Sequence, residues 1–249
     1  MNCSEKGTVR LILNGASISS SSTAPVVVEE AKKVLVTLAD GTTNTITDSS
    51  RLSTEEDYSA VIYSKEDLII NGNGTLNVNA GYRNGIKSTD DCIIVSGTLN
   101  ITSTEDGIIG KDLCGIVAGD ININAGSDGI KSTYDTDTTK GNVIIEGGNI
   151  TIKASNDGIQ AENILVINDG TINIKTNNGA ADTTQTHIDN MDMGRGGFGF
   201  NNNKTTTTTD DTSESRKGIK AGNMLIINDG DITIDSDDDS VHCNSVIYI

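Results

Sequence analysis

The chain repeats itself with a period of 22 residues. A Gly-Ile dipeptide begins at Gly85, Gly107 and Gly129, which are 22 residues apart, and recurs at Gly158 and Gly218 after intervals of 29 and 60 residues. We interpret the longer intervals as insertions into the same repeat. Self-similarity at this period is typical of solenoids, because their stacked units cannot bury an apolar face alone.

Each repeat holds three short runs in which apolar residues stand two positions apart, the spacing of a β-strand. One copy has Ile159 in the first run, Leu165 and Ile167 in the second, and Ile172 and Ile174 in the third. A glycine separates the second run from the third in every copy, at Gly74, Gly97, Gly119, Gly148, Gly170 and Gly230. A corner with positive φ would explain it. Three strands per turn, each with one inward face, predict an all-β fold, a parallel β-helix of about 22 residues per turn.

We expect one elongated domain over residues 1–249. Irregular N-terminal turns would occupy 1–60, regular coils 61–178, a Gly/Asn/Thr-rich insertion 179–216 and final coils 217–249. The insertion has no periodicity and too little apolar content to fold alone, so we expect a flexible loop whose Phe198 and Phe200 could touch a ligand. The sequence ends in a strand without a polar cap, and we therefore expect a fragment of a longer protein.

Composition excludes several classes of function. The chain has 35 acidic and 18 basic residues and a formal charge of −17, which argues against nucleic acid and anionic membranes as partners. No apolar run is long enough to span a bilayer. The two histidines, His187 and His242, fall in the long insertion and the last partial turn, so a Ser-His-Asp set is not expected. Cys92 and Cys114 share an inward column on adjacent turns, and we expect free, buried thiols. We expect a monomer.

Carboxylates recur at corresponding positions of successive turns. Asp106, Asp128 and Asp157 each precede the marker glycine, so the fold would stack three like charges, which repel unless something neutralises them. Either this edge is merely solvated, or it binds calcium, which prefers several oxygen ligands. We predict calcium at a corner lined by Asp90, Asp106, Asp112, Asp128, Asp135, Asp137, Asp157 and Glu162. Asp135 and Asp137 belong to the smaller, seven-residue insertion.

A second column lies on the outward face of the first strand, one residue after the marker isoleucine. It contains Lys87, Lys131, Gln160 and Lys220, which we predict to bind ligand and call the lysine column. Aligned lysines beside calcium would suit an acidic sugar polymer, but lysines also deter association of exposed strands, and the sequence leaves both interpretations open. The outward column of the third strand, which includes Asn77, Asn100, Asn122 and Thr151, would form a hydrogen-bonded ladder.

Several segments resemble a known family. The sequences Asp-Gly-Ile-Lys-Ser, Asp-Gly-Ile-Gln-Ala-Glu, Asn-Asp-Gly-Thr-Ile-Asn-Ile and Arg-Lys-Gly-Ile-Lys-Ala-Gly, with the Met/Gly/Phe-rich insert, are similar to clostridial-type carbohydrate-binding β-helix proteins over nearly the whole chain. The resemblance implies a secreted or surface-attached right-handed parallel β-helix, similar in fold to pectate lyases, that binds calcium, polygalacturonate and cellulose without catalysis. By that resemblance Asp106, Asp128 and Asp157 are calcium ligands. The chain departs from it at Asn84 and Lys217, where acids are expected, in its core cysteines, and in having no signal peptide.

We therefore expect a right-handed parallel β-helix that binds plant cell-wall polysaccharide in a calcium-dependent way without cleaving it. Acidic polymers would bind better than cellulose, because a chain without Trp and with 3% aromatic residues has few stacking platforms for neutral glucans. A calcium-dependent pectate lyase, with Lys131 or Arg195 as its base, is one alternative. A purely structural or adhesive surface solenoid is the other.

Overall fold

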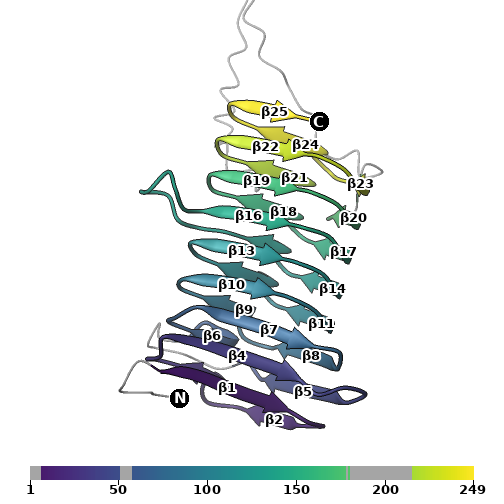
Figure 1. The fold of residues 1–249 in the computed structure, drawn as a ribbon. Helices are drawn as coiled ribbons and strands as arrows, with labels where there is room; N and C mark the ends of the chain where they lie inside the picture. The colour runs from purple at the N-terminus through teal and green to yellow at the C-terminus, as the bar shows by residue number, and fades with distance from the viewer. Residues whose placement is uncertain (1–6, 51–57, 178, 180–214) are drawn as a thin grey trace, which may run out of the picture.

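The computed structural model describes residues 7–50, 58–177, 179 and 215–249. Nearly all of the predicted loop at 179–216 lies outside these ranges, and so do Cys3, His187, Arg195, Phe198 and Phe200. The described chain forms a parallel β-helix of three sheets that stack along one axis (Figure 1). It contains no α-helix, so no described helix could span a membrane.

Each turn of the helix contributes one strand to each sheet. Sheet I has the order β1 (Thr8–Leu13), β4 (Lys33–Leu38), β7 (Leu68–Gly72), β10 (Asp91–Ile94), β13 (Leu113–Ile116), β16 (Asn142–Ile145), β19 (Ile164–Ile167), β22 (Met224–Ile227) and β25 (Val246–Tyr248). Sheet II has the order β2 (Ser17–Ser20), β5 (Thr43–Asp48), β8 (Thr75–Ala80), β11 (Thr98–Ser103), β14 (Asp120–Ala125), β17 (Asn149–Ala154), β20 (Thr171–Thr176) and β23 (Asp231–Asp235). Sheet III has the order β3 (Val26–Val28), β6 (Ala60–Ser64), β9 (Asn84–Ser88), β12 (Ile108–Gly110), β15 (Ile130–Lys131), β18 (Ile159–Ala161), β21 (Ile219–Ala221) and β24 (Val241–Cys243).

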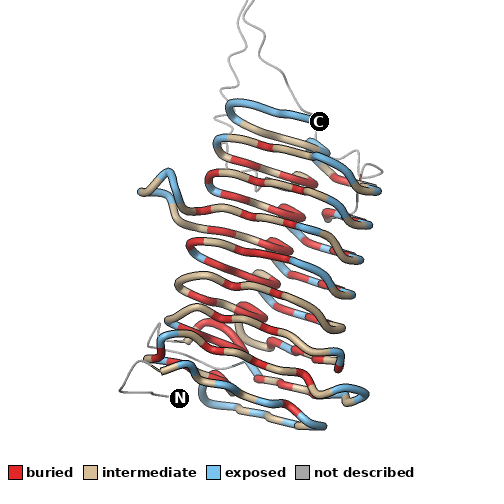
Figure 2. Tube along the Cα trace, in the orientation of Figure 1, coloured by how far each residue is buried: buried red, intermediate tan, exposed pale blue. Residues whose placement is uncertain are grey.

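The register of the sheets follows the repeat. Ile108 pairs with Ile86 on one side and Ile130 on the other, and Ile130 pairs with Ile159. All four side chains are fully buried. Figure 2 shows the same alternation along each coil, with buried residues between exposed ones. Burying a large aliphatic side chain stabilises a fold by roughly 1.5–3 kcal/mol, so these stacked inward columns form one continuous core and confirm the predicted solenoid.

The cysteines and most of the corner glycines behave as the sequence predicts. Cys92 pairs in register with Cys114, and both are free and fully buried. Burial raises the pKa of the Cys114 thiol to about 12. The corner glycines from Gly97 onward have φ between +106° and +124°, so a side chain there would be strained. In the first regular coil, however, Gly72 and not Gly74 carries the positive φ.

Two segments depart from the regular coil. The sequence predicts irregular turns over 1–60, but the described part of this segment forms strands that continue the same three sheets, and β1 pairs with β4 over six residues. The seven-residue insertion forms a loop between β15 and β16 that projects from the side of the stack (Figure 1). It lies at the corner where sheet III leads into sheet I.

Candidate functional site

The stacked aspartates that precede the marker glycines form a ladder with the backbone. Oδ1 of Asp106 accepts the amide of Asp128 at 3.0 Å, and Oδ1 of Asp128 accepts the amide of Asp157 at 2.9 Å. Asn84 begins this aspartate ladder by accepting the amide of Asp106, and the amide of Lys217 ends it on Asp157. The two departures from the acidic pattern therefore keep the same hydrogen bonds.

Lysines neutralise the buried part of the aspartate ladder. Asp128 and Asp157 are 4% and 1% exposed, and their Oδ2 atoms lie 2.6 Å from Lys131 Nζ and 3.2 Å from Lys220 Nζ. Burial raises the pKa of Asp128, and Lys131 opposes that rise. Burial would lower the pKa of Lys131, but Asp128 raises it overall. Backbone amides and lysines thus balance the like charges that the sequence stacks.

The lysine column is aligned as the sequence predicts, on the outer face of sheet III. Ile109 pairs with both Lys87 and Lys131, and Gln160 pairs with Lys131 and Lys220. Lys87 donates to Ser59 Oγ at 3.2 Å and pairs with no carboxylate of the described residues. Its burial lowers its pKa. Of the three lysines, Lys87 is therefore the one whose charge is not already matched by a ladder aspartate.

A separate acidic group lies where sheet III leads into sheet I. Carboxylate oxygens of Asp67, Asp90 and Asp91 lie within 4.8 Å of one another, and among the described residues this is the one such group of three. Burial, a hydrogen bond with Asp112 and repulsion from Asp67 raise the pKa of Asp90 to about 6. We call Asp67, Asp90 and Asp91 the acidic corner. Two oxygens that bind one Ca²⁺ at about 2.4 Å can be at most about 4.8 Å apart, so these carboxylates fit a calcium ion.

The eight predicted calcium ligands lie in three places and not at one corner. Asp106, Asp128 and Asp157 lie where sheet II leads into sheet III, because they precede the sheet III strands. Asp90 and Asp112 follow those strands and lie at or beside the acidic corner. Asp135, Asp137 and Glu162 line a hollow beneath the seven-residue loop. The width of sheet III separates the first group from the other two.

The acidic corner also contains residues that the predicted ligand set omits. Asp67 directly precedes β7 as Asp91 begins β10, and the pairing of Leu68 with Cys92 puts the two aspartates on neighbouring coils. The 24-residue spacing of Asp67 and Asp91, one coil of the less regular N-terminal part, was the signal available in the sequence.

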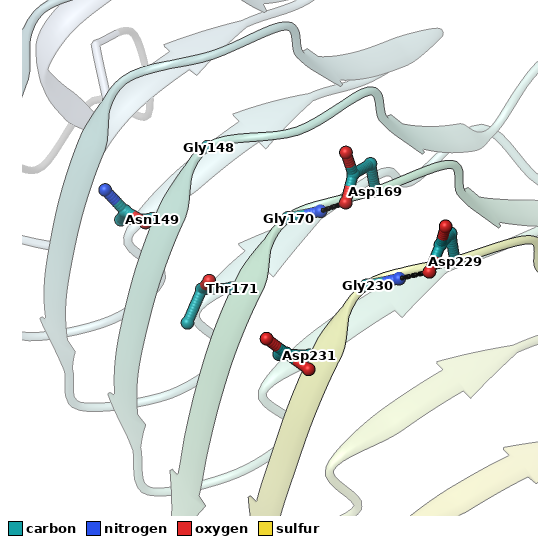
Figure 3. A pocket seen from close by; sticks show the side chains of 8 residues that line it. All are labelled: Gly148, Asn149, Asp169, Gly170, Thr171, Asp229, Gly230 and Asp231. Carbon is teal, nitrogen blue, oxygen red and sulfur yellow. Dashed lines mark hydrogen bonds between the residues drawn. The ribbon is translucent and has the colours of Figure 1, made fainter.

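A trough of 350 Å³ follows the corner where sheet I leads into sheet II. Figure 3 shows its glycine floor at Gly148, Gly170 and Gly230, with Asp169 and Asp229 on one side. Each of these two aspartates accepts the amide of its following glycine, at 2.7 and 2.8 Å. Asn149, Thr171 and Asp231 form the other side. Sequence reasoning gave these corner glycines only a structural role, and the trough was not predicted.

The outer face of sheet II carries polar, uncharged side chains in register. Asn100 Nδ2 donates to Asn77 Oδ1 at 2.9 Å, and Asn122 Nδ2 donates to Asn100 Oδ1 at 3.1 Å. The predicted ladder is therefore present. Its exposed amides offer further donors and acceptors to a ligand that lies along the axis.

Comparison with known proteins places the chain among carbohydrate-binding sequences. The profile of a family described as carbohydrate-binding domain-containing protein matches residues 1–249. A relative from Acetivibrio thermocellus, named carbohydrate-binding domain-containing protein, is 38% identical over 95 residues, which cover 36% of this chain and 33% of the relative. The matching part thus spans about a third of the length of that relative.

A solved structure has the same fold. It is titled "Structure of the polysaccharide lyase-like protein from C. thermocellum, Gadolinium derivative" and superposes with a TM-score of 0.65 at 24% sequence identity. The superposition covers 97% of this chain and 78% of that chain. At this identity the likeness concerns the fold alone.

Proposed function

Because the chain belongs to the family of carbohydrate-binding domain-containing proteins, we propose that it binds plant cell-wall polysaccharide on the outer surface of its β-helix without cleaving it. The observation that carries the proposal is the family match over residues 1–249. Polar columns repeat at each coil over sheets II and III, which suits a polymer whose sugar units also repeat. Such a polymer is found outside the cell, so we infer that the protein is secreted or held at the cell surface.

Acidic polymers are the ligands that the lysine column favours. Lys87 has no carboxylate partner among the described residues, and about a quarter of each of the Lys131 and Lys220 side chains is exposed. A uronate carboxylate would be attracted to these charges, more strongly at low salt than at high salt. A neutral polymer such as cellulose would bind more weakly, through hydrogen bonds to the Asn and Thr face of sheet II.

Calcium would act beside this column. Lys87 and Asp90 lie three residues apart at the end of one sheet III strand, so the acidic corner adjoins the lysine column. Asp67, Asp90 and Asp91 would hold the ion, which, when bound, supplies positive charge that can attract a uronate carboxylate. The aspartate ladder is a poorer candidate, because amides and lysines already occupy its buried oxygens.

Retention on insoluble polymers tests the proposal. We expect the protein to bind polygalacturonate more tightly than cellulose, with retention that falls in chelator and in high salt. Lys87→Gln should lower retention on polygalacturonate several-fold, whereas Lys153→Gln, on the outer face of sheet II, should leave it unchanged. Equal retention on both polymers in all conditions would refute the preference for acidic chains. No retention on any polymer would favour a structural or adhesive solenoid.

A lyase is the second candidate, favoured by the state of Lys87. Lys131, named as the base from the sequence, is ion-paired and has a raised pKa, whereas burial lowers the pKa of Lys87. A neutral amine there could take the proton beside a uronate carboxylate while the adjacent glycosidic C–O bond breaks. Elimination creates a double bond that absorbs ultraviolet light. A rise in absorbance with polygalacturonate that Lys87→Gln abolishes would show an enzyme, and a flat trace supports a binding protein.

A further inference from the structure

The seven-residue insertion makes one coil different from its neighbours. The loop between β15 and β16 projects from the stack (Figure 1), while the later coils turn this corner without it. It overhangs them and encloses a hollow of 280 Å³. Tyr134 and Asp137 of the loop, Glu162 and Asn163 of the next coil, Asn223 of the coil after it, and Asn244 line the hollow.

The loop is held in place from several sides. Asn163, only 6% exposed, donates Nδ2 to the carbonyls of Thr138 and Lys140. Lys140 forms an ion pair with Asp112. The Tyr134 ring lies 4.9 Å from Nζ of both Lys111 and Lys140, a cation–π distance. A loop fixed in this way needs little further ordering when a ligand binds.

The lining of the hollow favours a neutral sugar. It consists of amide, hydroxyl and carboxylate groups around one aromatic residue, and no lysine or arginine is among its lining residues. Asn223 Nδ2 donates to Asn163 Oδ1 at 3.1 Å, so two amides lie along the axis on successive coils. Sugar hydroxyls can donate to such acceptors, whereas Asp135, Asp137 and Glu162 would repel a uronate.

The size and position of the hollow suggest a chain end. At 280 Å³ it is slightly smaller than the pockets of about 300–1,000 Å³ that hold drug-sized ligands, and it has room for one or two sugar rings. Because the loop belongs to an earlier coil than the other lining residues, it closes the hollow on the side of β1. We propose that this hollow binds the terminal one or two residues of a neutral sugar chain. The inference rests on the proposed function and adds a second site with the opposite charge preference.

Excising the insertion gives a matched variant. Deletion of residues 134–140 joins Thr133 to Gly141 and restores the 22-residue coil of the neighbouring turns. Calorimetric titration would use cellobiose, xylobiose and digalacturonate as probes. We expect one of the neutral disaccharides to bind wild type at least tenfold more tightly than digalacturonate, in chelator as well as in calcium, and the deletion to weaken that binding at least tenfold. Retention on polygalacturonate should stay unchanged.

A point variant keeps the test valid if the deletion does not fold. Glu162→Gln should weaken the neutral disaccharide several-fold, and Asp169→Asn, in the trough, should not. The proposal is overturned if wild type binds neither neutral disaccharide at millimolar concentration, if the folded deletion binds it like wild type, or if chelator abolishes the binding. Loss of polygalacturonate retention with intact disaccharide binding would refute the proposed function and not this site.

Discussion

At the scale of single residues, the aspartate ladder shows why one residue type recurs without a ligand. Each ladder carboxylate accepts a backbone amide that would otherwise lack a partner at the corner. An amide side chain serves equally well, as Asn84 shows. The negative charge itself is needed only where a lysine pairs with it, at Asp128 and Asp157.

This distinction predicts different effects for one substitution at two positions. Asp106 has no ion-pair partner among the described residues, so Asp106→Asn should change the free energy of unfolding by less than about 0.5 kcal/mol. Asp128→Asn strands Lys131 and should cost more, and Asp128→Ala should cost about 2–3 kcal/mol because it also leaves a buried amide unsatisfied. Urea denaturation measures all three. Equal losses for Asp106→Asn and Asp128→Asn would contradict the role given to Lys131.

The acidic corner predicts a dependence of stability on pH. The pKa of Asp90 is raised to about 6, above the ordinary value of 3.8, so the folded state binds the proton more tightly than the unfolded chain. Without calcium, the Asp90 contribution to stability should therefore improve as pH falls from 7 through 6 towards 4. Thermal melts in chelator should show a smaller gain between pH 7 and pH 5 for Asp90→Asn than for wild type. An unchanged pH profile in the variant would assign the effect to other groups.

At the scale of elements, the marker glycines connect strands of sheets II and III. A Cβ at Gly158 would lie 2.3 Å from Ile174 Cγ2 and 2.6 Å from the carbonyl oxygen of Gly218. Gly129 is equally close to Ile152 and to the Gly158 carbonyl. The repeat thus keeps glycine because the next coil and the inward isoleucine occupy the space of a side chain.

Substitution of these glycines should therefore be costly. We expect Gly158→Ala to destabilise the fold by about 1–3 kcal/mol through overpacking. Gly147→Ala is the control, because the nearest atom to its added Cβ is 3.7 Å away and its φ is not positive. Chemical denaturation of both variants checks this. A Gly158→Ala variant as stable as Gly147→Ala would show that the coil can relax around the methyl group.

The strands could be predicted from the sequence, and the grouping of the acids could not. Alternation at a spacing of two, repeated every 22 residues, leaves few other ways to bury Ile159 or Ile172, and both are fully buried. Whether two acids on one coil meet depends on which end of a short strand each occupies. Asp106 and Asp112 are six residues apart but flank opposite ends of β12. Asp67 was missed because its spacing to Asp91 is 24 and not 22.

At the scale of the whole molecule, the formal charge of −17 gives every cation some stabilising effect. Folding brings the carboxylates closer together, and dissolved salt screens their repulsion. A rise in melting temperature on adding calcium would therefore not by itself identify a binding site. The test must separate a site at the acidic corner from screening of the entire surface.

Calcium titrations at constant ionic strength make that separation. An ion that binds only the folded state at one hundred times its Kd stabilises it by about 2.7 kcal/mol, an effect that saturates as the site fills. We expect such a saturating rise in melting temperature for wild type and for Asp169→Asn, whose changed side chain lies in the trough. Asp91→Asn should lose most of the rise, because it removes one of the three converging carboxylates. If magnesium or added NaCl reproduces the rise, or if Asp91→Asn keeps it, the stabilisation comes from the overall charge and the acidic corner is not a calcium site.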